Sequence, residues 1–368
     1  MKARYSHIDV AKGIGILFIV LGHYWGLVHG PGEVYRIIFS FHVPLFFFLS
    51  GVLMDYSDDL SATAVKKFSS YLKPYFVILA LASIYFILYE NTNPIEYFLR
   101  VLYGTGPTIP NKFLPLWFLP HLWLVSLFSC LIFKHTNLGS KPLVFKSVCL
   151  GILLCIGYLG IQTFWPNPGP GIRFPLPGLP FSMDLVLISS FYFILGSLLK
   201  DYIISPKFNL IMFMSSAIIF GLLHFHFDFT MDLNIRRYDN IFMSTAEALT
   251  GIYIVLSSSV LIDRSAAIRK FFVYLGSSSL FILIFHFWIQ VVSVKLIYSL
   301  INDEYYVIRY VITKYLSLTL AVLLPLFFFE LVKRSRVLQK LFLPAQPAGT
   351  IRPGDGLLQK SGNLVKED

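Results

Sequence analysis

Long apolar stretches separated by short polar segments follow one another from the start of the chain to about residue 332. An α-helix needs about 20 mostly apolar residues to cross the hydrocarbon core of a bilayer. The pattern therefore predicts an all-α fold, a polytopic transmembrane helical bundle of about ten spans. The expected spans are 13–30, 35–54, 72–90, 116–133, 145–165, 184–200, 209–226, 243–262, 272–294 and 306–332.

The polar positions between these spans predict the orientation of the chain. Loops on the side of the N-terminus carry about twice as many Lys and Arg residues as loops on the other side. By the positive-inside rule, both termini are expected in the cytoplasm. We expect one membrane-embedded domain, 1–340, followed by a short polar cytoplasmic tail, 341–368, that is disordered.

Composition agrees with lipid as the main solvent of the folded chain. Hydrophobic residues make up 56% of the 368 residues and charged residues only 14%, with a mean hydropathy of +0.70. A net charge of +10 does not indicate nucleic-acid binding, because no polar segment is long enough to form a basic domain. Cys130, Cys149 and Cys155 lie in apolar stretches and indicate neither a disulfide framework nor a zinc site.

The first expected span contains the clearest candidates for chemistry. Asp9, Lys12 and His23 fall within about 60° of one helix face. His23 lies roughly 16 Å along the helix from Lys12, near the bilayer midplane. Glycines at 13, 15 and 22 allow another helix or a ligand to approach closely. A lone buried histidine is more often structural than catalytic, but the charged stripe that leads to His23 favours a catalytic role.

The second expected span brings another histidine to the same depth. His42 lies about 18 Å from the cytoplasmic end of its helix, beside Pro44, which lacks a main-chain donor, while Ser50 contributes to a small face. His286 is expected at a similar depth. These imidazoles can form an acid/base pair, share one substrate, or simply hydrogen-bond across a helix interface. No close partner accompanies them, so no metal site is predicted.

Other ionisable residues in or near the spans have less specific expected roles. His121 comes out at a depth similar to that of His23, His42 and His286, and four histidines from four helices indicate a polar chamber near the midplane. For His121 alone a structural role is favoured, because it lies beside Pro120. His224 and His226 are expected at the membrane interface, at an outer helix end. Three acidic residues at or inside span ends have no assigned role: Asp184, Glu247 and Glu330.

A basic loop follows the second expected span. Lys66, Lys67 and Lys73 are expected beside the cytoplasmic membrane surface. Together with Lys12 they can neutralise a polyphosphate such as the nucleotide end of coenzyme A, since Lys binds phosphate as a point charge. The alternative is that they belong to the general basic inner rim, which an anionic leaflet attracts without any specific ligand.

Several of these segments together are similar to a known family. RYSHIDVAKGIGILFIVLGH (4–23), FHVPLFFFLSG (41–51), LWFL (116–119) and the I-x-H of 284–286 occur in this order. They resemble the acyltransferase-3 family of integral membrane O-acyltransferases. The nearest branch resembles fucose 4-O-acetylase-like proteins and polysaccharide O-acetyltransferases.

The resemblance implies transfer of an acyl group, usually acetyl from acetyl-CoA, to a carbohydrate hydroxyl. His23 matches the key histidine of the family, and Lys12 matches the donor-side basic position, where many members have Arg. Acetyl-CoA is then a cosubstrate and no cofactor is bound. The expected partners are the bilayer, acyl-CoA, a polysaccharide or lipid-linked saccharide, and glycan-assembly proteins. The expected location is the bacterial inner membrane.

These expectations assign a role to each candidate residue. His23 acts as general base or forms an acyl-imidazole, with Asp9 orienting Lys12 or a nearby loop. Coenzyme A is bound by Lys12 and the three loop lysines. Residues expected to hold the acceptor or shape the chamber are His42, Ser50, Trp117 and His286.

Two other classes of function are compatible with the same residues. A transporter or glycan flippase would use the midplane histidines as a proton relay, although such folds often contain two matched broken helices and no second copy of the His42-x-Pro44 segment is found. A non-catalytic membrane scaffold would leave the polar stripe of the first span unexplained.

Overall fold

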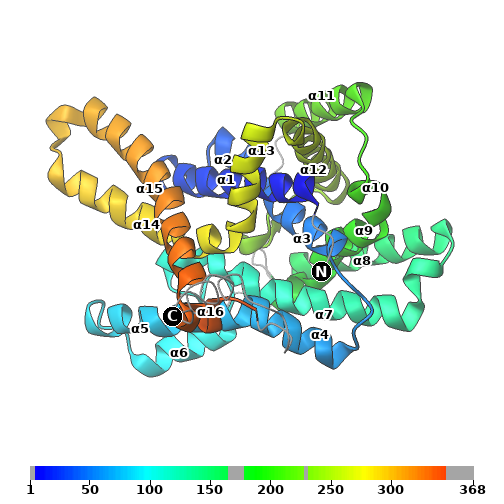
Figure 1. Ribbon diagram of the computed structural model, residues 1–368, viewed down its shortest axis with the longest axis horizontal. Helices are drawn as coiled ribbons and strands as arrows, with labels where there is room; N and C mark the ends of the chain where they lie inside the picture. The colour runs from blue at the N-terminus through cyan, green and yellow to red at the C-terminus, as the bar shows by residue number, and fades with distance from the viewer. Residues whose placement is uncertain (1–4, 165–177, 228–230, 345–368) are drawn as a thin grey trace, which may run out of the picture.

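A computed structural model describes residues 5–164, 178–227 and 231–344 and shows a helical protein with one two-residue hairpin of strands (Figure 1). The fold class is as the hydrophobic pattern predicts. The elements are α1 Ser6–His29, α2 Glu33–Phe39, α3 His42–Val52, α4 Leu60–Lys67, η1 Phe68–Leu72, α5 Lys73–Leu88, α6 Pro94–Tyr103, η2 Asn111–Trp117, α7 Phe118–Thr136, η3 Leu138–Ser140, α8 Leu143–Phe164, η4 Pro180–Leu185, α9 Val186–Leu198, α10 Lys200–Ile204, α11 Leu210–His226, β1 Met231–Asp232, η5 Leu233–Ile235, β2 Arg237–Tyr238, α12 Ile241–Asp263, α13 Ala266–Ser277, α14 Ser279–Leu300, η6 Asp303–Tyr305, α15 Tyr306–Arg334 and α16 Arg336–Phe342.

The spans expected from the sequence largely correspond to helices. In the described ranges, nine helices are long and apolar enough to cross a membrane. The expected span 209–226 corresponds to α11, which is apolar but shorter than the others. Counted with those nine, α11 brings the number of apolar helices in the described ranges to the predicted ten. The expected disordered tail begins within α16, and residues 345–368 lie outside the described residues.

Two expected spans contain breaks that the apolar pattern does not reveal. The expected span 272–294 is wrong in its first part, because α13 ends at Ser277 and the spanning helix α14 starts at Ser279. The second span is interrupted between α2 and α3 at Ser40 and Phe41. Pro44 has no N–H to donate one turn back, so a continuous helix would lose a hydrogen bond there.

Two helix crossings depend on glycines that lie against a facing backbone. Where α1 crosses α13, a Cβ at Gly13 would lie 2.3 Å from the carbonyl oxygen of Phe272, and one at Gly276 would lie 1.9 Å from that of Asp9. The crossing of α3 and α9 repeats this arrangement with Gly51 and Gly196. Such contacts are too short for any side chain, so glycine permits the close packing that positions α1 and α3.

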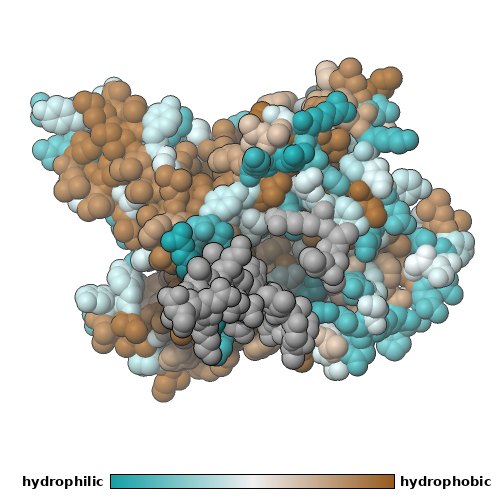
Figure 2. Space-filling model, in the orientation of Figure 1, coloured by the Kyte–Doolittle hydropathy of each residue, from teal (hydrophilic) through white to brown (hydrophobic). Residues whose placement is uncertain are grey.

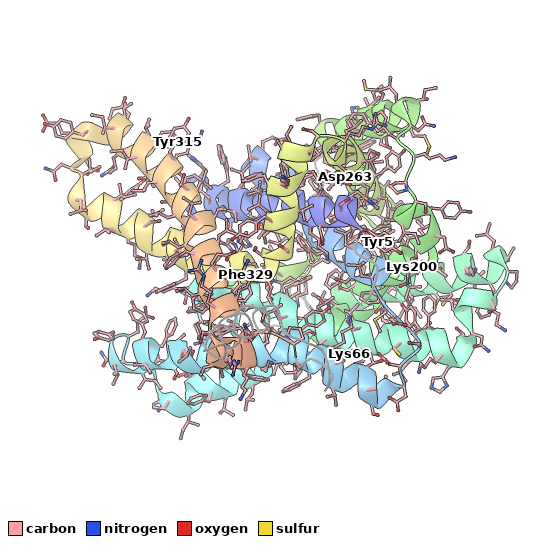
Figure 3. All side chains as sticks on the ribbon, viewed as in Figure 1. Tyr5, Lys66, Lys200, Asp263, Tyr315 and Phe329 are labelled. Atoms are coloured by element: carbon pink, nitrogen blue, oxygen red, sulfur yellow. The ribbon has the colours of Figure 1, made fainter. Side chains whose placement is uncertain are left out.

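The helices α14 and α15 form an arm that extends from the rest of the bundle (Figure 1). Its surface is mainly apolar (Figure 2), with Leu296 and Val307 more than half exposed. Tyr315 lies on the outer part of α15, whereas Phe329 lies where α15 rejoins the body and packs 5.0 Å from the ring of Phe281 (Figure 3). An exposed apolar surface of this kind is stable when lipid surrounds it.

Candidate active site

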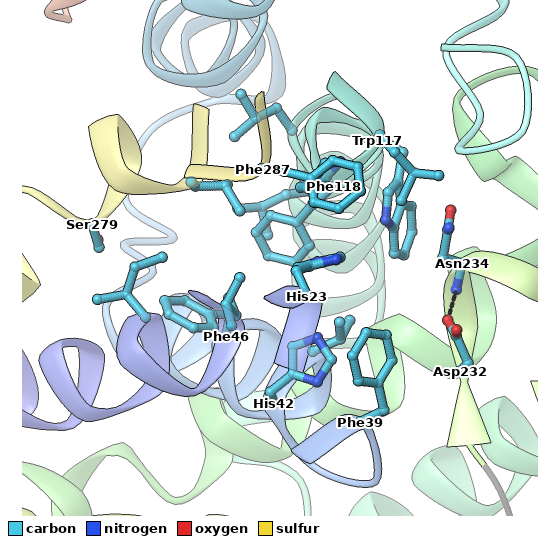
Figure 4. A pocket seen from close by; sticks show the side chains of 18 of the residues that line it. His23, Phe39, His42, Phe46, Trp117, Phe118, Asp232, Asn234, Ser279 and Phe287 are labelled. Atoms are coloured by element: carbon cyan, nitrogen blue, oxygen red, sulfur yellow. Dashed lines mark hydrogen bonds between the residues drawn. The ribbon is translucent and has the colours of Figure 1, made fainter. Parts of the chain in front are cut away.

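A cavity of about 710 Å³ lies within the helical bundle (Figure 4). α1 lines it lengthwise, from Lys12 through His23 to Leu27. At 1.5 Å per residue, Lys12 and Leu27 are about 22 Å apart along the helix axis. The other walls come from α2, α3, η1, η2, α7, α14 and the 231–238 hairpin, which comprises β1, η5 and β2. The cavity thus has a Lys12 end and, beyond His23, an end formed by Asp232 and Asn234.

The stripe expected on the first span is present on α1. Lys12 and His23 both line the cavity. Asp9 does not line it, but its Oδ1 lies 3.5 Å from the Lys12 ammonium. Because both side chains are largely buried, this ion pair restricts the conformation of Lys12. Asp9 thus contacts Lys12 without itself lining the cavity.

Three histidines from three helices gather near the midpoint of the bundle. The rings of His23 and His286 are 5.2 Å apart, and His42 lines the same cavity as His23. His42 donates from Nδ1 to the Ile38 carbonyl at 2.9 Å, and His286 donates from Nδ1 to the Ile282 carbonyl at 2.8 Å. Because a carbonyl oxygen only accepts, Nε2 of each neutral ring retains its lone pair.

The His23 ring has no hydrogen-bond partner among the residues that the structure describes, and neither does Nε2 of the buried His286. Both rings therefore have unused capacity to accept a proton or a hydrogen bond. Within the described ranges, no three His, Cys, Asp or Glu side chains are grouped so as to hold a metal ion.

Aromatic rings surround the histidines. Phe39 lies 5.6 Å from the His23 ring and 4.5 Å from the His42 ring, and Phe287 lies 5.2 Å from His23. Phe46 and Phe118 complete this part of the lining (Figure 4). A polar group bound between these rings is shielded from bulk water, and electrostatic interactions there are stronger than in solution.

The Lys12 end is more polar than the middle of the cavity. Ser50 of α3 and Tyr71 of the π-helical turn η1 line it. Lys67 extends to Tyr71, with Nζ 3.4 Å from the phenol oxygen and 5.4 Å from the ring centre. Lys67 therefore contacts the cavity-lining Tyr71 but does not itself line the cavity. A π-helical turn often occurs at functional positions in helices, and this one contains the cavity-lining Tyr71.

The other two loop lysines do not line the cavity. Lys66 is more than half exposed and pairs with Asp58. Lys73 donates to the main-chain carbonyl of Leu343, which ties the start of α5 to the end of α16. Of the four lysines expected to form one site, only Lys12 lies in the cavity wall, and only Lys67 contacts a residue of that wall.

The opposite end contains polar residues that the sequence did not single out. Asp232 accepts from the Tyr35 hydroxyl at 2.5 Å and from the Asn234 amide at 3.0 Å. All three residues line the cavity. Burial raises the pKa of Asp232, while the bonds from Tyr35 and the amides of Asn234 and Ile235 oppose the rise. The only sequence signal for this end was a polar run after the seventh expected span, DLNIRRYDN (232–240).

A buried ion pair holds the hairpin in place. The Arg236 guanidinium donates to both carboxylate oxygens of Asp184, at 2.9 and 3.2 Å, and both side chains are fully buried. It also donates to the Asn234 carbonyl and to Ser182. This assigns a structural role to Asp184. The bidentate pair connects the segment before α9 to the hairpin that carries Asp232.

The remaining expected residues fall outside the cavity, with the exception of Trp117. Trp117 lines the cavity, and its ring stacks on that of His121 with centres 5.7 Å apart. His121 is fully buried, and its two ring nitrogens bond the Phe181 carbonyl and the Ser189 hydroxyl. His224 lies in the last turn of α11, at the expected helix end, but it is buried, and its ring nitrogens contact Glu247 and Glu33 at 2.6 and 2.8 Å. His226 is exposed. Glu330 bonds Tyr274 and Lys333.

Comparison with known families decides the class of the protein. A family model described as an acyltransferase domain matches residues 5–330, which includes every residue of the cavity wall. The chain belongs to the acyltransferase-3 family. No curated protein and no solved structure matches the chain.

Membership in this family makes the protein a membrane acyltransferase, and its apolar helices make it a multi-pass integral membrane protein. The enzyme is therefore favoured over the transporter and the scaffold. For an acyltransferase, an unbonded imidazole in a sheltered cavity is the group expected to handle the proton of the acceptor.

Proposed function

We propose that this acyltransferase transfers an acyl group, most simply acetyl, from acyl-CoA to a hydroxyl of a cell-surface or exopolysaccharide sugar, in the bacterial cytoplasmic membrane. One observation carries the proposal. A single cavity contains a lysine at one end, an unbonded histidine within it, and a second polar end beyond that histidine. This arrangement suits two substrates that meet at His23 from opposite ends.

The Lys12 end suits the donor. Lys12 attracts the phosphates of coenzyme A, and Asp9 restrains its side chain. Lys67 adds positive charge at Tyr71, whereas Lys66 acts only as part of the basic rim. The narrow acyl-bearing arm of the cosubstrate then extends along α1 toward His23, between apolar side chains such as Ile16 and Ile19.

During acyl transfer, His23 takes up one proton and then gives it back. His23 takes the proton of the acceptor hydroxyl as the oxygen attacks the thioester carbonyl. A C–O bond forms, the C–S bond breaks, and the departing thiolate receives the proton from His23. His42 and His286 retain Nε2 lone pairs and accept hydrogen bonds from the hydroxyl or the imidazolium. A route in which His23 is first acylated by the thioester and then passes the acyl group to the hydroxyl gives the same ester and the same free coenzyme A.

Transfer of label tests the proposal directly. Purified protein in liposomes, given acetyl-CoA labelled in the acetyl group and a panel of methyl glycosides, is expected to form labelled acetyl esters. Release of free coenzyme A should match ester formation, because one thioester is consumed for each ester made. If glycosides moved across the membrane without any label transfer, the transporter would replace the enzyme.

Replacing Lys12 by alanine is expected to raise the KM for acetyl-CoA by about tenfold or more, since a hydrogen bond to a charged group contributes about 1.5–3 kcal/mol. The KM for the glycoside should be unchanged. The matched control is Lys66→Ala, which removes a lysine that faces Asp58 outside the cavity. Equal effects of the two substitutions on the donor KM would show that only general basic charge is involved.

A further inference from the structure

The end of the cavity farthest from Lys12 has the features of a binding site for hydroxyl groups. Asp232 and Asn234 are each less than a tenth exposed, yet both line the cavity. The Oδ1 atom of Asn234 has no hydrogen-bond donor among the described residues. Nothing in the transfer chemistry at His23 uses these groups. A buried polar atom without a partner costs free energy unless a ligand supplies the missing bond.

The carboxylate of Asp232 is held in one orientation. Tyr35 donates to Oδ2 at 2.5 Å, and the amides of Asn234 and Ile235 donate to the same carboxylate. Since a carboxylate has about four lone-pair positions, these three bonds leave capacity for one more donor. Figure 4 shows Asp232 and Asn234 joined by their hydrogen bond on the side of Trp117 and Phe39.

The hairpin that carries these groups cannot easily shift. Arg236 ties it to Asp184, and the Asn234 carboxamide packs so closely on Gly106 that a Cβ there would lie 1.5 Å from Oδ1. Hydrogen-bonding groups with a fixed geometry bind a hydroxyl-bearing ring more tightly than mobile ones, because less conformational entropy is lost.

Aromatic rings lie directly beside these polar groups. The Tyr35 and Phe39 rings are stacked with centres 3.7 Å apart, and Phe39 also contacts His23 and His42. Trp117 lines the cavity nearby. The C–H groups of a sugar ring pack on such faces, while its hydroxyls take up polar bonds at the edge. A ring bound at this end of the cavity would therefore meet aromatic surface beside the polar groups, in the same cavity that His23 lines.

We infer that Asp232, Tyr35 and Asn234 form the acceptor subsite, which takes a neutral, hydroxyl-rich ring and discriminates against anionic sugars. The inference rests on the proposed function, because it names where the second substrate of the transfer binds. Asp232 accepts a hydrogen bond from an acceptor hydroxyl that is not the one acylated at His23. A uronic acid would place its carboxylate near that of Asp232 in a site shielded from water, which costs binding free energy.

Substitutions in the subsite are expected to weaken acceptor binding without changing donor binding. With the methyl glycoside that the wild type acetylates best, Asp232→Asn and Tyr35→Phe are each expected to raise the acceptor KM by about tenfold, the value of one buried hydrogen bond to a charged group. The KM for acetyl-CoA should be unchanged. The matched control is Asp239→Asn, which lies just after the hairpin and pairs on the surface with Arg237.

A second measurement distinguishes binding from a structural effect. The wild type is expected to prefer neutral methyl glycosides to the corresponding uronic acids, and Asp232→Asn should reduce this preference by about tenfold. A variant that was merely misfolded would lose both activities in proportion. An unchanged acceptor KM and an unchanged preference in folded variants would overturn the subsite alone, whereas a wild type that acetylates no glycoside would overturn the proposed function.

Discussion

Replacement of His23 by alanine is expected to lower the rate of acyl transfer by roughly 10²–10⁴-fold, the usual contribution of a positioned general base. His23 lines the cavity without any hydrogen bond to the described residues, whereas Nδ1 of both His42 and His286 is engaged by a main-chain carbonyl. The loss should be in kcat for label transfer in liposomes, while the variant accumulates in the membrane at the wild-type level.

His29→Ala is the matched control for this substitution. His29 ends the same helix but lies outside the cavity, where its ring is tilted against Trp25 and contacts Tyr310 edge-on. It should therefore retain nearly full activity. A His23→Ala variant that transferred label at the wild-type rate would remove the imidazole from the mechanism.

The second large effect is expected on the stability of the protein, when Asp184 is replaced. Asp184→Ala should lower the free energy of unfolding by about 3–5 kcal/mol, because it leaves the Arg236 guanidinium buried without its counter-ion. Thermal unfolding of the purified protein in detergent measures this change. Acceptor KM should also rise in the surviving folded fraction, since Arg236 positions the hairpin that carries Asp232.

A second ion pair provides the comparison. Arg237 and Asp239 form a similar contact at 2.9 Å at the end of the same hairpin, but both are partly exposed. Asp239→Ala should cost no more than about 1 kcal/mol. The double variant Asp184→Leu with Arg236→Met removes both buried charges and should unfold at a higher temperature than Asp184→Ala. Equal losses for the buried and exposed pairs would contradict the role assigned to Asp184.

The transmembrane helices could be predicted from the sequence because lipid requires long apolar stretches. The breaks within and between these helices could not be predicted in this way. The join between α13 and α14 consists of serines in an apolar context, and a helix can continue or stop at such residues depending on what packs against them. Here Gly276 holds α13 against Asp9 of α1, and the chain has to change direction immediately afterwards.

The candidate site was predictable where its residues share one helix. Lys12 and His23 lie on one face of α1 by periodicity alone. The Asp232 end combines Tyr35 of α2 with a hairpin almost two hundred residues away, and no local pattern links them. The loop lysines show that nearness in sequence does not ensure a shared site. Sequence placed all of them near the donor, but Asp58 and the Leu343 carbonyl direct Lys66 and Lys73 elsewhere.

The length of the cavity has an electrical consequence for the cell. A hollow that follows α1 for about 22 Å extends over most of a hydrocarbon layer about 30 Å thick, so ions must be kept from following it across the membrane. Each elementary charge that leaked through would dissipate about 2.3 kcal/mol per 100 mV. The phenyl rings of Phe39, Phe46, Phe118 and Phe287 line this hollow, and an apolar lining is an unfavourable path for an ion.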